Sequence, residues 1–157
     1  MRPRRCIQCR SETEITAVDA AAGEAKTLTI AVKEMPVAAC ARGHRQFVHP
    51  EFPLRLVEHL IDEDEARLPA GEEKGLLVKH YHCAGCGAEL APQPDHRHTF
   101  TVDVALADLS PFRVELTMPV YRCPSCDKEQ LHSLKEIRKY TPEALAQAFK
   151  AAGIPAA

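Results

Sequence analysis

Cysteines spaced for metal binding constrain this chain more than any other feature. There are seven, and six of them stand in pairs separated by two residues: Cys6 and Cys9, Cys83 and Cys86, and Cys123 and Cys126, with Cys40 as the seventh. Two residues between cysteines let a tight turn present both thiolates to one ion. Two such turns supply the four ligands that tetrahedral zinc prefers. The pattern therefore predicts a fold organised around zinc.

The second half of the chain carries a complete set of four thiolates. We expect one zinc site built from two knuckles: Cys83, Cys86, Cys123 and Cys126. Gly87 follows the first knuckle and suits the positive φ angle that such turns require. The intervening residues 87–122 exceed the usual spacing of about 15–20, and a hairpin accounts for the extra length. The alternative is a group of reduced or disulfide-linked core cysteines.

The first half is less regular, because its second knuckle has a single cysteine. Gly43 stands where the spacing of Cys123 and Cys126 calls for a cysteine, and a histidine follows one residue later. Sulfur and imidazole can bind the same ion, so we predict a site of three cysteines and one histidine: Cys6, Cys9, Cys40 and His44. His49 is a second-choice ligand, and loss of the metal from this half is the alternative. Two zinc ions per chain then use all seven cysteines and one histidine.

A short repeated frame suggests that one unit was duplicated. Met35-Pro36-Val37 precedes Cys40 and Met118-Pro119-Val120 precedes Cys123, each at the same distance. An acidic segment containing proline and glycine separates the halves. We predict a first unit at residues 1–65 with a trailing helix, a linker at 66–75 and a second unit at 76–157 with C-terminal helices.

Hydrophobic periodicity predicts the elements of each unit. Alternation indicates strands over Thr27–Val32, Thr99–Leu106 and Phe112–Met118, the last two forming a hairpin. Leu54, Val57, Leu60 and Ile61 have helical spacing. Ser133 to Glu136 has the pattern of a capping box, and Thr141-Pro142 that of a helix start. The predicted fold is small α+β: two tandem zinc-ribbon-like units, each an antiparallel hairpin between two knuckles followed by a short helix.

Composition explains why such units would need metal. Aromatic residues make up 5% of the chain and tryptophan is absent, so two small units would have thin cores that need a staple. The formal net charge of -2 produces no field that draws the whole chain to nucleic acid or membrane. No apolar segment follows the basic N-terminus as in a secretory signal. We therefore expect a cytoplasmic protein, whose paired cysteines bind metal rather than form disulfides.

The knuckles and the frame between them resemble the YgiT-type (MqsA-like) zinc-finger domains of bacterial antitoxins. The matching residues are Cys6, Cys9, Met35-Pro36-Val37 and Cys40, and again Cys83, Cys86, Gly87, Met118-Pro119-Val120, Cys123 and Cys126. The resemblance implies a bacterial zinc module that docks against a partner protein. Those antitoxins also carry a DNA-binding helix-turn-helix, for which the segment after Cys126 is too short.

Three functional classes follow from these features. The first is a non-catalytic adaptor with structural zinc, in which Phe47, Phe52, Phe112 or Tyr121 anchors a protein partner. The second is a nucleic-acid-binding zinc ribbon that uses two basic groups: Arg2, Arg4, Arg5 and Arg10 near the first knuckle, and Lys135, Arg138 and Lys139 near the C-terminus. The oligomeric state is left open.

The third class is an enzyme or metal carrier, and we consider it the weakest. It would use exchangeable thiolates or the spare histidines His80, His82, His96 and His98. Filled cysteine-rich zinc sites have no open position for a catalytic water. The cysteine pairs lie beside predicted antiparallel hairpins rather than in the βαβ setting of a redox dithiol. We therefore predict that the protein is not an enzyme.

Overall fold

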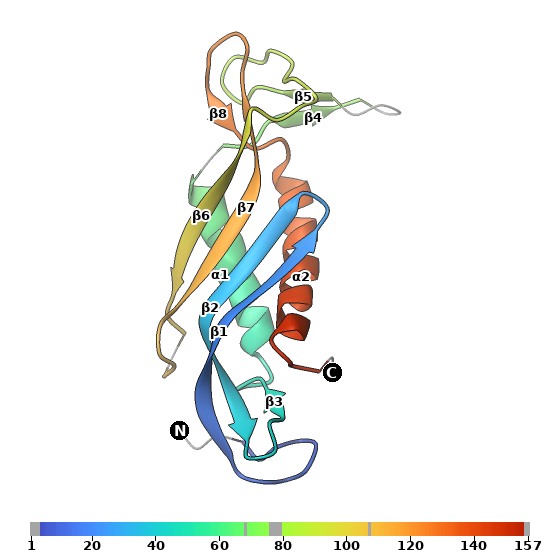
Figure 1. Ribbon diagram of the computed structural model, residues 1–157. Coiled ribbons are helices and arrows are strands. Elements are labelled where there is room, and N and C mark those ends of the chain that lie inside the picture. Colours follow the sequence, from blue (N-terminus) through green and yellow to red (C-terminus); the bar gives the residue numbers. More distant parts are fainter. Residues whose placement is uncertain (1–3, 68, 76–79, 107, 156–157) are drawn as a thin grey trace.

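A computed structural model describes residues 4–67, 69–75, 80–106 and 108–155 (Figure 1). Arg2, one of the predicted basic residues, lies outside them. The chain forms an α+β fold, as predicted. In order along the chain its elements are β1 (Thr13–Ala25), β2 (Leu28–Cys40), β3 (Arg45–Gln46), α1 (Phe52–Arg67), β4 (Glu72–Lys74), β5 (His80–His82), β6 (His96–Val104), β7 (Phe112–Arg122), β8 (Glu129–Gln130) and α2 (Leu134–Ala151).

The main sheet joins the two halves of the sequence. Its order is β1-β2-β7-β6, with β3 paired to β2 and β8 paired to β7. At its centre, β2 of the first half runs antiparallel to β7 of the second, with residues 29–33 opposite 113–117. The predicted unit boundaries are not tested by this arrangement. Part of the predicted linker is a strand, however, because β4 pairs with β5 in a separate two-stranded sheet.

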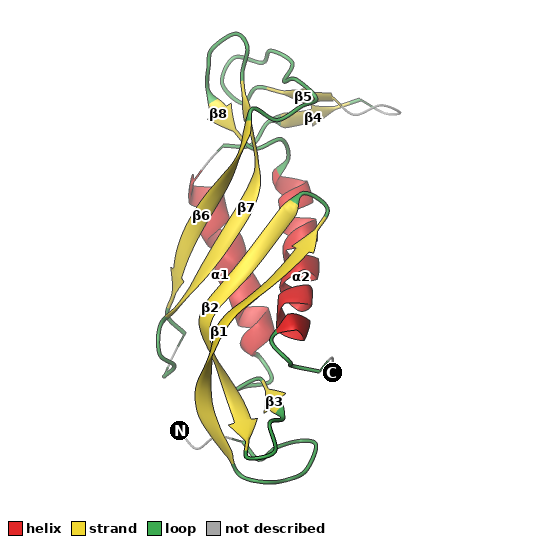
Figure 2. Cartoon of the chain, in the orientation of Figure 1, coloured by secondary structure: helices red, strands yellow, loops and turns green. Residues whose placement is uncertain are grey.

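Alternation places one face of the sheet in the core and the other toward solvent. Ile30 and Val32 of β2 and Val114 and Leu116 of β7 have no exposed surface. The opposite face carries polar pairs, such as the ion pair of Lys33 with Glu115 at 3.0 Å. Both helices lie on the buried face, as Figure 2 shows. The predicted strand Phe112–Met118 falls within β7, whereas Thr27–Val32 begins one residue before β2 and Thr99–Leu106 runs two residues past the end of β6.

Each helix covers strands of the other half. Helix α2, from the second half, packs on β1 and β2, whereas α1, from the first half, contacts β6 and α2. Phe52 of α1 stacks on Phe112 of β7 with ring centroids 5.9 Å apart. A single cluster of buried residues therefore draws on both halves. This shared core is larger than either thin core expected for a separate unit.

Helix α2 begins where the capping pattern predicts and continues past the second predicted start. The Ser133 hydroxyl accepts a hydrogen bond from the Glu136 amide at 3.3 Å. The expected N-cap at Thr141 is wrong, because Thr141 is fully buried inside the helix and donates its hydroxyl to the Ile137 carbonyl at 2.6 Å. Pro142 lacks the N–H of a helix interior. The apolar face of α2 packs on the sheet and keeps the helix continuous.

Of the four aromatic residues proposed as partner anchors, three belong to the interior. Phe52, Phe112 and Tyr121 are at most 8% exposed. Phe47 is partly exposed and packs edge-on against Phe149 of α2 at 4.8 Å between centroids. Phe47 alone of these four lies where a partner can reach it.

Candidate metal centres

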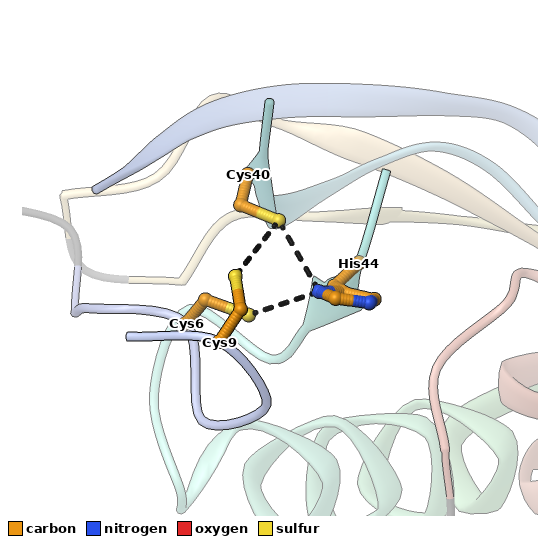
Figure 3. A group of neighbouring side chains, drawn as sticks. All are labelled: Cys6, Cys9, Cys40 and His44. Carbon is orange, nitrogen blue, oxygen red and sulfur yellow. Dashed lines mark hydrogen bonds between the residues drawn. The ribbon is translucent and has the colours of Figure 1, made fainter. Parts of the chain in front are cut away.

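The first predicted centre assembles at one end of the sheet. Cys6 and Cys9 lie on the N-terminal turn, Cys40 ends β2, and His44 precedes β3 (Figure 3). Their ligand atoms lie within 4.8 Å of one another. The Sγ atoms of Cys9 and Cys40 are 3.8 Å apart, and His44 Nδ1 lies 3.5 Å from the sulfurs of Cys6 and Cys40.

These separations fit one tetrahedral zinc ion. Zn–S bonds of about 2.3 Å imply sulfur–sulfur edges of about 3.8 Å, and a Zn–N bond of about 2.1 Å implies a sulfur–nitrogen edge of about 3.6 Å. A disulfide would bring two sulfurs to about 2.05 Å, and all seven cysteines are free. The donor set therefore has both the chemistry and the spacing for zinc. His49 is not part of the cluster among the described residues.

The second predicted centre assembles at the opposite end. Cys83 follows β5 and Cys123 follows β7, and because β2 and β7 are antiparallel, Cys123 and Cys40 lie at opposite ends of the sheet. The four ligand sulfurs lie within 4.8 Å of one another: Cys83, Cys86, Cys123 and Cys126. Cys83 to Cys126 measures 3.6 Å, and Cys86 to Cys123 measures 3.4 Å. Figure 1 places β5 and β8 far from β3, which marks the first centre.

A common backbone turn presents the cysteines of three knuckles. The amides of Cys6, Cys83 and Cys123 each donate to the carbonyl five residues later, at 2.7 to 3.0 Å. The fourth residue after each cysteine has a positive φ angle, at Arg10, Gly87 and Asp127. In the second centre, the amides of Gly85 and Cys86 also point at Cys83 Sγ, 3.3 and 3.5 Å away. Such amides stabilise a thiolate.

The turn after Cys40 is one residue shorter, which explains the histidine. The Cys40 amide donates to the carbonyl of His44, four residues later, and Gly43 has the positive φ of +86°. Gly43 thus corresponds to Asp127, the positive-φ residue of the longer turn. The turn after Cys40 has no residue that corresponds to Cys126. His44 lies beyond the positive-φ residue, and its longer side chain supplies the fourth donor.

Two buried glutamines that sequence reasoning missed hold the knuckles in place. Gln130 of β8 donates from Nε2 to Cys83 Sγ at 3.2 Å and accepts from the Ala84 amide at 2.9 Å. Gln46 of β3 accepts from the Ile7 amide at 2.9 Å and donates to the Arg5 carbonyl at 3.0 Å. Gln46 lies opposite the residue two positions before Cys40, and Gln130 lies opposite the residue two positions before Cys123. A glutamine shortly after each second knuckle was the available signal.

Hydrogen bonding favours the thiolate form, which zinc requires, at one cysteine of each centre in particular, whereas burial raises the pKa of Cys6 and the neighbouring sulfurs raise the pKa values of Cys86 and Cys126. The hydrogen bond from Gln130, supported by the Cys86 amide, lowers the pKa of Cys83 to about 5. In the first centre, hydrogen bonds from the side chain and backbone of Ser11 lower the pKa of Cys9 to about 6. Ionised sulfur at neutral pH reduces the number of protons that zinc must displace.

Two of the four spare histidines pair with carboxylates, whereas His82 contacts the Gly87 carbonyl and His98 packs against Phe100. His80 contacts Glu89 at 2.6 Å, and His96 contacts Asp95 at 2.8 Å. Asp95, His96 and Glu129 also have donor atoms within 4.8 Å of one another. Arg122 lies among them, 3.7 Å from Asp95 and 2.7 Å from Glu129. The guanidinium already neutralises these exposed acids.

Replacing Gln130 by leucine is expected to weaken zinc binding at the second centre by about 10- to 100-fold, the usual effect of losing a partner that orients a ligand. Gln130→Leu removes the donor to Cys83. The matched change Gln46→Leu removes only bonds to backbone groups, so its effect on the first centre should be smaller. Zinc affinity is measured by competition with a chromophoric chelator. Equal losses in both variants would contradict a direct role for Gln130 at sulfur.

Comparisons with protein-family models, curated proteins and solved structures gave no match for this chain. Within the described part of the chain, neither helix has the length and apolar character needed to cross a membrane.

Proposed function

We propose that this chain is a non-catalytic zinc protein whose two structural ions fix the ends of one sheet for contact with a protein partner. The observation that carries the proposal is the pair of complete four-donor clusters, one of three cysteines and a histidine and the other of four cysteines. Each cluster draws its donors from segments distant in the sequence. Zinc would therefore act as a cross-link between a strand end and a loop.

The donor chemistry favours a structural role over a catalytic one. Four protein ligands fill a tetrahedral site and leave no position for water or substrate. Thiolates also donate charge to the metal, which weakens its action as a Lewis acid. Cys6, Cys40, Cys83 and Cys123 are all buried. Free thiols at this spacing suit a reducing compartment, so the proposal places the protein in the cytoplasm.

The adaptor role is supported by the resemblance of the knuckles to zinc domains of bacterial antitoxins. Under this proposal the protein would be antitoxin-like or regulatory, and its zinc-fixed turns would present side chains to a partner. Ile7, on the first knuckle, is 64% exposed although its neighbour Cys6 is 2% exposed. An apolar side chain held outward on a rigid turn suits a protein contact.

Nucleic-acid binding is the second candidate, supported by the exposed arginines of the first knuckle. Arg4, Arg5 and Arg10 are exposed, and no ion pair joins them to a carboxylate within the described part of the chain. The other basic group, Lys135 to Lys139, lies at the start of α2 and at the opposite end of the molecule (Figure 1). The two groups therefore do not form one continuous surface.

Native mass spectrometry tests the proposed metal content. We expect two zinc ions per chain in the wild type, and one when Cys123 and Cys126 are both replaced by serine. The matched pair Cys6→Ser and Cys9→Ser should also leave one ion. Loss of both ions in either double variant would show that the centres are not independent. Absence of zinc from the wild type would reject the proposal.

A further inference from the structure

At the second centre, a segment of the chain itself fills the space beside β8. The Leu131 amide donates to the Pro69 carbonyl, and the Gly71 amide donates to the Leu131 carbonyl, both at 2.9 Å. The segment continues as β4, which pairs with β5 just before Cys83. Residues 69–74 therefore lie beside the end of β8 at Leu131 and beside β5, which leads into the knuckle of Cys83 and Cys86.

The duplicated geometry identifies the corresponding place at the first centre. Gln46 and Gln130 occupy the same position relative to their knuckles, so Phe47 corresponds to Leu131 and Arg4 to Tyr81 of β5. No described residue makes a hydrogen bond to the Phe47 backbone. Within the described chain, no strand pairs with residues 4–5 as β4 pairs with β5.

A cleft occupies this place at the first centre. It has a volume of about 290 Å³, and its lining includes Arg4, Ile7, Phe47, Pro50, Pro53 and Pro155. Ile7 corresponds to Ala84 of the second centre, and it adds an apolar wall where the filled site has only a methyl group. The cleft therefore combines the unpaired backbone of Phe47 with an apolar lining, which is the composition of a groove for an extended peptide.

The charge around the cleft selects the kind of peptide. Arg4 lines it, and Arg5 and Arg10 are exposed on the same knuckle, where Arg5 bonds to the Arg10 carbonyl. The segment that fills the second site has small and apolar residues followed by acids, Pro69-Ala70-Gly71-Glu72-Glu73. An acidic stretch of the same kind would meet the arginines at the first site.

We propose that the cleft beside Phe47 binds an extended segment of a partner protein, with small apolar residues followed by acidic ones. The segment pairs with the Phe47 backbone as residues 69–71 pair with Leu131. This inference rests on the proposed adaptor function and names its surface. Because the wall at Ile7 belongs to the knuckle of Cys6 and Cys9, binding requires zinc at the first centre.

Selection from a random dodecapeptide library displayed on phage tests this surface on the zinc-loaded protein. We expect enriched peptides to carry acidic residues next to proline or small apolar residues. A synthetic, fluorescein-labelled peptide from the enriched set should lose about tenfold or more in affinity with Ile7→Ser, as for a buried contact at an interface centre. Ala84→Ser, the matched change at the second centre, should leave the affinity unchanged. The Phe47 amide should gain protection from hydrogen exchange when the peptide binds.

Each contrary result has a separate meaning. Enriched peptides that bind equally well to the Ile7→Ser variant would overturn the cleft and leave the adaptor function standing. A library that yields no zinc-dependent binder would overturn both. A single-stranded 20-nucleotide DNA that displaces the peptide at physiological salt and binds more tightly would assign the arginines to nucleic acid and reject the peptide site.

Discussion

Chelation of zinc is expected to disorder both ends of the molecule while the centre of the sheet stays folded. Each structural site contributes on the order of 10 kcal/mol when binding is coupled to folding. This free energy stabilises the turns and loops that carry the ligands, at the two ends of the sheet. Residues 4–11 contribute nothing to the main hydrophobic core among the described residues. Without zinc, this knuckle is held by backbone hydrogen bonds, Gln46 and the bond from Thr13 to the Arg4 carbonyl.

The second centre has a small apolar cluster of its own, but the ligands are part of it. Cys83 and Cys123 pack with Leu90 and Tyr121. Without zinc, no bond joins these four sulfurs, which lie within 4.8 Å of one another, so the surrounding loops should open. The strands β2 and β7 bury Ile30, Val32, Val114 and Leu116 completely, and no metal ligand belongs to this cluster among the described residues, so we expect it to persist without zinc.

Hydrogen exchange with and without a chelator measures this difference. After zinc removal, the amides of Cys83, Gly87 and Leu131 should lose their protection, whereas those of Val32 and Val114 should retain most of theirs. Restoring zinc should restore protection at the ends. Full protection of both ends in the metal-free protein would contradict structural zinc. Loss of protection at Val114 together with the ends would instead mean that the metal supports the whole fold.

The sequence predicted the features that depend on a fixed spacing between neighbouring residues. The spacing of the cysteines and of His44 predicted the two segments that meet in each cluster, and alternation predicted the strand interiors of β6 and β7. The one-residue displacement of His44 was also visible in the sequence. These features are local, because a tight turn or a pleated strand is determined by neighbouring residues.

The pairing of the halves could not be predicted in the same way. The sequence of β2 has the same alternation whether the strand forms the edge of a small separate sheet or pairs with β7 in a larger one. Strand β1 was also hard to locate, because alanines such as Ala17, Ala20 and Ala22 give weak alternation. Likewise, the start predicted at Thr141 followed a valid local rule, and packing of α2 on the sheet overrode it. Long-range contacts determine all three features.

Replacing Gly23 of β1 by alanine tests the unforeseen packing of α2 on the first hairpin. A Cβ atom at Gly23 would overlap the backbone oxygen of Ala144 and the backbone nitrogen of Ala148, and would lie 2.7 Å from Gln147 Cβ. Backbone atoms of a helix cannot turn aside as a flexible side chain can. The strand and helix must therefore separate. We expect a loss of about 2–3 kcal/mol in the free energy of unfolding, the upper part of the range for overpacking.

Urea unfolding of the zinc-loaded protein measures this loss, with Ala22→Ser as the control. Ala22 is the neighbouring exposed residue, and its change should stay within about 0.5 kcal/mol. If the shared core makes the halves one cooperative unit, Gly23→Ala should also lower the exchange protection of Val114, which lies in the other half. A loss confined to β1 and β2 would mean that the halves unfold separately. A variant as stable as the control would show that α2 does not pack closely on Gly23 in solution.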